Sequence, residues 1–186
     1  MAKKFGYRSR AAFKLKQIDE RFGILKNVKN VLDLGAAPGG WLQVVAEEIG
    51  EDGFVLGVDL KQIETLGFKN VETIIGDITS PDIIEKIREK FSRKFDLVLS
   101  DLSPNISGIW ELDHVRQIDL STRSMAIASD VLNPEGWMVL KVFQGSEFNR
   151  FVEEVRENFK YVWLFKPKAS RRESAEIYIV ANKLKR

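Results

Sequence analysis

The feature that most constrains the fold is a regular alternation of short apolar runs with amphipathic segments of helical length. The runs rich in branched and aromatic residues predict strands at 30–35, 54–59, 71–76, 95–100, 136–142, 161–165 and 175–181. The segments that predict helices lie at 8–21, 39–49, 80–91, 113–132 and 146–159. Strands that alternate with helices favour a parallel sheet covered on both faces. We therefore predict a doubly wound α/β fold.

Turn residues refine this prediction at three places. Ser80-Pro81 predicts a helix start, with Ser80 as the N-cap. The sequence Asn-Pro-Glu-Gly at 133–136 predicts the end of a helix before the next strand. Only about nine residues separate the last two runs, too few for a helical crossover, so they should form an antiparallel hairpin at one sheet edge.

Length and composition limit the class of protein. A chain of 186 residues, 44% hydrophobic and 30% charged, fits a single globular domain over 1–186 and excludes a disordered or fibrous chain. No apolar run reaches the ~18 residues of a membrane span, and no secretory signal opens the chain, so we expect a cytoplasmic protein. With no cysteine and one histidine, His114, we expect no metal site.

The net charge is only +2, but the basic residues are concentrated in two runs. The first precedes any acidic residue and contains Lys3, Lys4, Arg8, Arg10, Lys14 and Lys16. The second contains Lys166, Lys168, Arg171 and Arg172. Either run alone can be a solvated face. If the two meet in space, they form a surface for a polyphosphate such as RNA.

A glycine-rich turn, Asp-Leu-Gly-Ala-Ala-Pro-Gly-Gly-Trp at 33–41, follows the first predicted strand. Glycine and alanine allow a sharp turn and close approach of a ligand, and the next helix offers its N-terminal amides. The turn is not a phosphate-binding P-loop, because Trp41 follows Gly40 where that motif has Lys-Ser/Thr. Tight turns also need glycine for structural reasons alone.

An acidic residue lies near the end of each of the first four strands: Asp33, Asp59, Asp77 and Asp101. Asp59 follows the glycine turn by about 20 residues, where a carboxylate can accept hydrogen bonds from both ribose hydroxyls of a nucleoside. Asp77 could accept a hydrogen bond from an adenine amino group. A single acid at a strand end is as often an N-cap or a loop residue. Four in series, with no base in the turn, suit S-adenosylmethionine, an adenosine without phosphates and with a positive sulfonium.

Two charged residues interrupt apolar runs, Lys141 in Met-Val-Leu-Lys-Val-Phe and Glu176 in Glu-Ile-Tyr-Ile-Val. A buried charge costs several kcal/mol unless it is paired. Each residue therefore belongs either to a structural ion pair, to a protected edge strand, or to a functional site.

Three motifs, 8–15 (RSRAAFKL), 32–41 (LDLGAAPGGW) and 101–105 (DLSPN), together resemble the RrmJ/FtsJ (RlmE) family of 2′-O-ribose RNA methyltransferases over nearly the whole chain. The resemblance implies a class I methyltransferase fold with strand order 3-2-1-4-5-7-6 and strand 7 antiparallel. It implies a catalytic set of Lys14, Asp101, Lys141 and Glu176. It also implies that S-adenosylmethionine binds at Gly35, Gly39, Trp41, Asp59, Asp77 and Asp101.

The activity so implied is methyl transfer from S-adenosylmethionine to a ribose 2′-hydroxyl of RNA, nearest to the enzymes that modify a uridine of large-subunit ribosomal RNA. The alternatives are methylation of a tRNA anticodon loop and a non-enzymatic module that binds RNA or the ribosome. Lys141 would either remove the hydroxyl proton or orient the hydroxyl. We expect a monomer whose basic N-terminal helix (1–22) contributes to RNA binding and catalysis. The predicted RNA contacts are Lys3, Lys4, Arg8, Arg10, Lys168, Arg171 and Arg172.

Overall fold

The computed structural model describes residues 5–185. The helices in this part of the chain are α1 (Ala11–Phe22), α2 (Gly40–Ile49), α3 (Ile83–Lys90), α4 (Trp110–Val131) and α5 (Phe148–Asn158). The strands are β1 (Asn30–Leu34), β2 (Phe54–Asp59), β3 (Val71–Ile75), β4 (Phe95–Ser100), β5 (Leu132–Phe143), β6 (Phe159–Phe165) and β7 (Glu176–Leu184).

The strands form one seven-stranded sheet with the order β3-β2-β1-β4-β5-β7-β6. Strands β1 to β5 pair in parallel, whereas β7 runs antiparallel to both β5 and β6. The α/β class, the strand order and the antiparallel last strand are all confirmed. The antiparallel hairpin of β6 and β7 follows from its short connection, as predicted.

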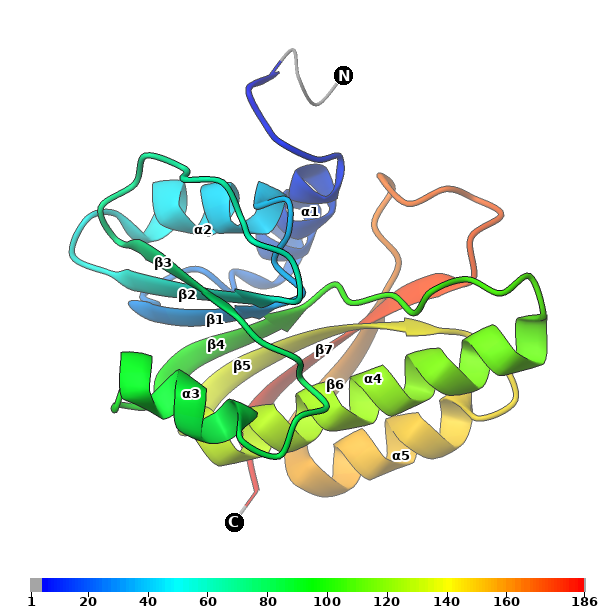
Figure 1. Ribbon diagram of the computed structural model, residues 1–186. Coiled ribbons are helices and arrows are strands. Elements are labelled where there is room, and N and C mark those ends of the chain that lie inside the picture. The colour runs from blue at the N-terminus through cyan, green and yellow to red at the C-terminus, as the bar shows by residue number, and fades with distance from the viewer. Residues whose placement is uncertain (1–4, 186) are drawn as a thin grey trace.

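Helices cover both faces of the sheet (Figure 1): α1 and α2 lie on one face, and α3, α4 and α5 lie on the other. On the first face, Leu15 and Ile18 of α1 pack in the same core as Val180 of β7. On the second face, Phe151 and Val155 of α5 are buried with strand residues of their own core. The central strands are apolar on both sides because both sides are covered.

The start of α3 differs from the prediction that Ser80 is its N-cap. The helix begins at Ile83, and Asp82 occupies the N-cap position. The Ser80 hydroxyl donates to the Asp82 carboxylate, and no side-chain hydrogen bond caps the first amides of α3. The helix prediction at 80–91 is therefore right in kind and about one turn too long at its N-terminal end.

The segment 133–136 also differs from the prediction, because it interrupts a strand and does not separate a helix from one. Helix α4 ends at Val131, and β5 begins at once with Leu132. The pairing of β4 with β5 jumps from Phe95–Leu132 to Leu97–Trp137, so the four turn residues bulge out of the strand. The Asn133 side chain donates to Asp96 Oδ1 over 2.7 Å, which ties the bulge to β4.

Candidate active site

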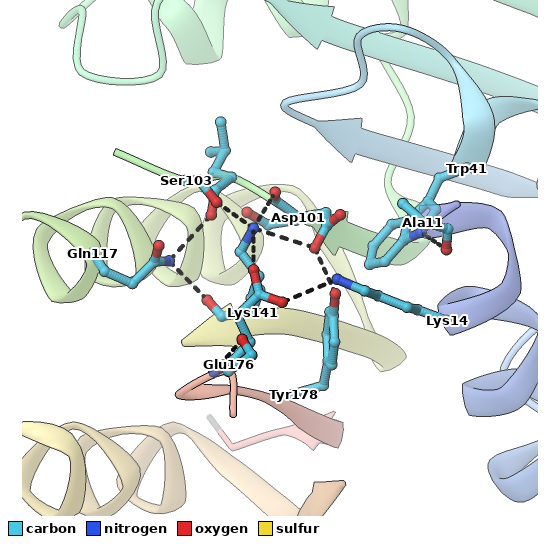
Figure 2. A network of polar contacts seen from close by, with 12 residues as sticks. Ala11, Lys14, Trp41, Asp101, Ser103, Gln117, Lys141, Glu176 and Tyr178 are labelled. Carbon is cyan, nitrogen blue, oxygen red and sulfur yellow. Dashed lines mark hydrogen bonds and ion pairs between the residues drawn. The ribbon is translucent and has the colours of Figure 1, made fainter. Parts of the chain in front are cut away.

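The candidate site lies where the carboxyl ends of β1, β4 and β5 reach the edge of the sheet. Because β7 runs antiparallel to its neighbours, its first residue, Glu176, lies at the same edge. Helix α1 passes over this edge and presents Lys14 to it (Figure 2). An edge of this kind, at the ends of parallel strands, is where doubly wound folds bind ligands.

Four charged residues, which we call the tetrad, meet at this edge: Lys14, Asp101, Lys141 and Glu176 (Figure 2). Lys14 Nζ lies 3.0 Å from Glu176 Oε2. Lys141 Nζ lies 3.6 Å from Glu176 Oε1 and 3.5 Å from Asp101 Oδ1. The structure thus brings together all four residues of the catalytic set that the resemblance implies.

Lys141 is the most buried member of the tetrad, with 4% of its side chain exposed. Its ammonium donates to the Asp101 backbone carbonyl over 2.9 Å and to the Ser103 hydroxyl. Gln117 and Ser121 of α4 donate to its own carbonyl oxygen, which fixes this part of β5. These partners offset the cost of burying the charge, and they aim the amine at the open edge of the sheet.

The ionisation of Glu176 is set by two opposing effects. Burial alone would raise the pKa of Glu176, but the ammonium groups of Lys141 and Lys14 outweigh it and hold that pKa below its ordinary value. Glu176 is therefore a carboxylate at neutral pH. It stabilises the positive charge of both lysines.

Tyr178 is a member of the site that the sequence prediction missed. Its hydroxyl donates to Asp101 Oδ1 over 2.6 Å. Burial raises the pKa of Tyr178 well above its ordinary value, and the charge of Asp101 adds to the effect, so the phenol keeps its proton. A usable signal was present, since Tyr178 lies two residues after Glu176 on β7 and thus on the same face of the strand.

The glycine turn lies beside the tetrad and forms a small pocket. Gly35 and Gly39 have φ angles of +77° and +108°, a region that side chains rarely tolerate. A Cβ atom at Gly35 would come within 2.5 Å of the Leu102 side chain. The pocket is lined by Ser9, Ala11, Asp33, Gly35, Ala36, Ala37, Trp41 and Asp101.

Asp33 gives this pocket its chemical character. The side chain is buried, and its Oδ2 atom has no hydrogen-bond partner within residues 5–185. Burial, reinforced by the charges of Asp101 and Asp59, raises the pKa of Asp33 well above its ordinary value. An acceptor without a partner, beside two further carboxylates, suits a positively charged ligand such as the sulfonium and ammonium groups of S-adenosylmethionine.

Asp59 and Asp77 both make local hydrogen bonds. Asp59 accepts from the amides of Ala37 and Lys61, over 3.0 and 2.9 Å. Asp77 is exposed, and two hydrogen bonds from Thr79 lower its pKa. Each carboxylate has about four lone-pair sites, so both retain the capacity to accept hydrogen bonds from a ligand.

Trp41 has a structural contact that the prediction of cofactor binding did not include. Its indole nitrogen donates to the Ala11 carbonyl over 2.7 Å, and its ring lies 5.9 Å from that of Tyr178. Trp41 therefore joins α2 to the start of α1, three residues before Lys14. It also remains at the wall of the small pocket.

The two basic runs meet beside the tetrad. Arg10 of the first run and Arg171 of the second line one pocket together with Lys14 and Glu176. Figure 1 shows why: the segment before α1 and the connection between β6 and β7 project at the same end of the sheet. Lys168 lines an adjacent groove, and Arg172 is exposed on the same connection.

Three of the predicted RNA contacts require separate description: Arg8, Lys3 and Lys4. The Arg8 guanidinium donates to the backbone carbonyls of Pro38, Glu64 and Thr65, so it holds the glycine turn against a neighbouring loop. Lys3 and Lys4 lie outside the described residues.

Within residues 5–185, no group of three His, Cys, Asp or Glu side chains is arranged to hold a metal, and no helix is long and apolar enough to span a membrane.

Comparison with known proteins gives a consistent result. Residues 7–184 match the family described as FtsJ-like methyltransferase. The ribosomal RNA large subunit methyltransferase E of Methanocaldococcus jannaschii is 48% identical over 186 residues, covering 98% of this chain and 76% of that protein. The protein of the same name from Methanothrix thermoacetophila is 50% identical over 183 residues, covering 98% of this chain and 70% of that protein.

A solved structure agrees with these relatives. A crystal structure named for a ribosomal RNA methyltransferase from Plasmodium falciparum superposes with a TM-score of 0.83 at 30% sequence identity. The superposition covers 96% of this chain and 98% of that one.

Proposed function

Because the chain belongs to the FtsJ-like methyltransferase family, we propose that it transfers a methyl group from S-adenosylmethionine to a ribose 2′-hydroxyl of large-subunit ribosomal RNA, at a uridine. The observation that carries this proposal is the buried Lys141 ammonium, set between Asp101 and Glu176 beside the Asp33 pocket. The names of the relatives from Methanocaldococcus and Methanothrix support the choice of RNA.

The cofactor would lie in the pocket of the glycine turn. Gly35 and Gly39 allow its close approach, Asp59 and Asp77 accept hydrogen bonds from its adenosine, and Asp33 and Asp101 face its positive charges. When bound, S-adenosylmethionine supplies a methyl group that a nucleophile can attack. Asp33 then gains the positive partner that it otherwise lacks.

The nucleophile is the ribose 2′-oxygen, which attacks the methyl carbon as the carbon–sulfur bond breaks and the sulfur leaves as a neutral thioether. The hydroxyl proton leaves in the same step and passes to Lys141 or to solvent water. Lys141 contacts the 2′-oxygen and stabilises its developing negative charge, with Lys14 as the second nearby cation. Asp101 and Glu176 hold the two amines in place, and Tyr178 fixes the Asp101 carboxylate. Positioning supplies a large part of the rate, since methyl transfer needs near-linear alignment.

The basic residues around the tetrad would bind the RNA backbone. Arg10, Lys168, Arg171 and Arg172 are exposed on this side of the molecule. Lys3 and Lys4 extend the same run toward the N-terminus, and Arg8 contributes by holding the glycine turn. We further propose a monomer that acts in the cytoplasm without a metal.

The test is to incubate the chain with methyl-labelled S-adenosylmethionine and large-subunit ribosomal RNA, and in parallel with tRNA. A 2′-O-methyl group blocks alkaline cleavage of the next linkage, so labelled alkali-resistant dinucleotides should appear from ribosomal RNA, with uridine at the labelled position. Label in tRNA alone would contradict the proposed substrate. RNA binding without any label would identify a non-enzymatic binding module.

A further inference from the structure

Strand β6 carries a row of aromatic side chains at the edge of the sheet. Tyr161, Trp163 and Phe165 alternate along the strand and so point to the same face. The rings of Tyr161 and Trp163 lie 5.9 Å apart, with their planes 18° from parallel. Trp137 of β5 stacks on Trp163 with 5.9 Å between the ring centres. The ring centre of Phe22 of α1 lies 5.7 Å from that of Trp163. We call Tyr161, Trp163 and Phe165 the aromatic row.

The aromatic row is unusually open to solvent for its size. Tyr161 is 41% exposed and Trp163 is 39% exposed, although Phe22 and Trp137 pack against it. Packing of this kind fixes the rings without covering them. Adjacent exposed aromatic side chains in a soluble protein commonly mark an interaction surface.

The strand register connects the aromatic row to the candidate active site. Phe165 pairs with Tyr178 across the β6–β7 ladder, and Tyr178 pairs with Lys141 across the β7–β5 ladder. Residues directly opposite in antiparallel strands share a face, so Phe165 lies on the same face as Lys141, about 10 Å away across two strand spacings. Trp163 and Tyr161 continue from there along β6, away from the tetrad.

Positive charge accompanies the aromatic side chains. The Lys160 ammonium lies 5.4 Å from the centre of the Tyr161 ring, and the Arg21 guanidinium lies 5.4 Å from that of Phe22. Lys166 and Lys168 line a groove with Arg21 and Phe165 that also includes the acidic Glu20. This groove adjoins the pocket lined by Arg10 and Arg171, because the amide of Ala169 in that pocket donates to the Gln17 side chain in the groove.

We propose that the aromatic row stacks unpaired bases of the substrate RNA on one side of the target nucleotide, so that the RNA runs from the tetrad past Lys168 and along β6. This inference rests on the proposed function and extends it to a second contact region. Aromatic rings beside basic side chains are the recurring surface for single-stranded nucleic acid, because every base has a face that can stack. The continuity with the basic surface favours RNA over a protein partner.

The test measures binding of a fluorescein-labelled oligouridylate of 12 nucleotides by anisotropy over a range of salt concentrations. Trp163→Leu should weaken binding about 5- to 150-fold, the effect of removing one stacked base. The salt dependence should not change, because no charge is altered. Trp163→Phe retains an aromatic ring, so its affinity for the oligouridylate should fall much less. Leu164→Ala is the matched control, since Leu164 is 42% exposed on the opposite face of the same strand, and it should bind like the wild type.

Wild-type affinity in Trp163→Leu would overturn the inference. If that variant does not fold, as judged by circular dichroism, Tyr161→Leu takes its place in the same comparison. A wild-type dimer that Trp163→Leu converts to a monomer, with RNA affinity unchanged, would instead identify an interface between copies. The proposed function fails on a different result, the absence of methyl transfer by the wild type, so the two failures are distinguishable.

Discussion

Lys141 shows how one residue can be both structurally paired and chemically competent. Its ammonium has two carboxylates and a hydroxyl as neighbours, which is the arrangement of a satisfied core ion pair. The same neighbours hold it at the edge of the sheet, next to the pocket for the cofactor. A structural role and a catalytic role therefore predict different results when the amine is removed.

For Lys141→Ala, we expect turnover to fall by about 100- to 10,000-fold, since that is the range for removal of an acid–base or hydrogen-bonding group. Binding of S-adenosylmethionine, measured by calorimetry, should be nearly unchanged. The fold should survive, because Glu176 retains Lys14 and Asp101 retains Tyr178 as partners. A variant that melts early but transfers methyl at the wild-type rate in a single turnover would refute the catalytic role. Substantial activity in Lys141→Arg would favour electrostatic stabilisation over proton removal.

We predict that Asp33 lowers the free energy of unfolding of the protein, although its carboxylate favours binding of the cofactor. Below its ordinary pKa of 3.8, Asp33 is protonated in both the folded and the unfolded states. Above that pH the unfolded chain releases the proton first, because the folded pKa is raised, so the free energy of unfolding falls as the pH rises. Asp33→Asn should remove this destabilisation and raise the melting temperature at pH 7, by about 2–4 °C for each kcal/mol gained.

The same substitution should weaken binding of S-adenosylmethionine, because asparagine lacks the carboxylate that would pair with the positive groups of the cofactor. Melting curves at pH 3.5 and pH 7 check the sign: most of the gain in stability at pH 7 should be lost at pH 3.5, which is below the ordinary pKa of 3.8. Equal melting temperatures of wild type and Asp33→Asn at pH 7 would contradict the assignment.

At the scale of elements, sequence patterns predicted the seven strands well. The buried central strands read as apolar runs, and the more exposed β3 and β6 read as runs of branched and aromatic residues. Loop lengths decide whether neighbours are parallel. They failed at Ser80 and at 133–136, where turn residues are consistent with more than one local structure. The cofactor pocket was predictable from the glycine turn and the acids at the strand ends, whereas the tetrad was predictable only through the family resemblance. Lys14 and Glu176 lie 162 residues apart, and no local pattern encodes such a contact. Tyr178 was missed because it reads as an ordinary apolar position of β7.

The docking of α1 on α2 is the element contact on which the site most depends. Trp41 donates its indole N–H to the Ala11 carbonyl, and Lys14 follows one turn later on α1. Trp41→Phe keeps an aromatic ring at this buried position but removes the hydrogen bond, which contributes about 0.5–1.5 kcal/mol. A displacement of Lys14 by about 1 Å can reduce the rate by up to about 100-fold. We therefore expect the single-turnover rate to fall by up to about 100-fold. The hydrogen bond itself should contribute only about 0.5–1.5 kcal/mol to the free energy of unfolding.

The matched control for that prediction is Trp110→Phe, since Trp110 packs on His114 and Phe143 and lies on α4. It should keep the wild-type rate. If Trp41→Phe and Trp110→Phe have the same rate as the wild type, then the indole hydrogen bond does not position Lys14.

At the scale of the whole molecule, the basic residues are distributed in a way that the net charge of +2 conceals. The chain brings the segment before α1 and the β6–β7 connection to the same end of the sheet (Figure 1). Glu176 pairs with Lys14 there, and two further acids, Glu20 and Glu173, line the adjoining pockets. Two distant runs thereby form one surface beside the tetrad, which neither run could form alone.

The salt dependence of RNA binding tests whether this surface binds phosphates. Removing one basic side chain that binds a phosphate of single-stranded RNA should reduce the slope of log K against log salt by about 0.7, so the double variant Arg10→Glu with Arg171→Glu should reduce it by about 1.4. Arg8 is left intact, because its guanidinium holds the glycine turn and its removal would also disturb the cofactor pocket. Arg150→Glu is the control, since Arg150 is exposed on α5 and pairs with Glu147 and Glu154. A slope equal to that of the wild type in the double variant would mean that both runs are only solvated, and that the RNA reaches the tetrad by another route.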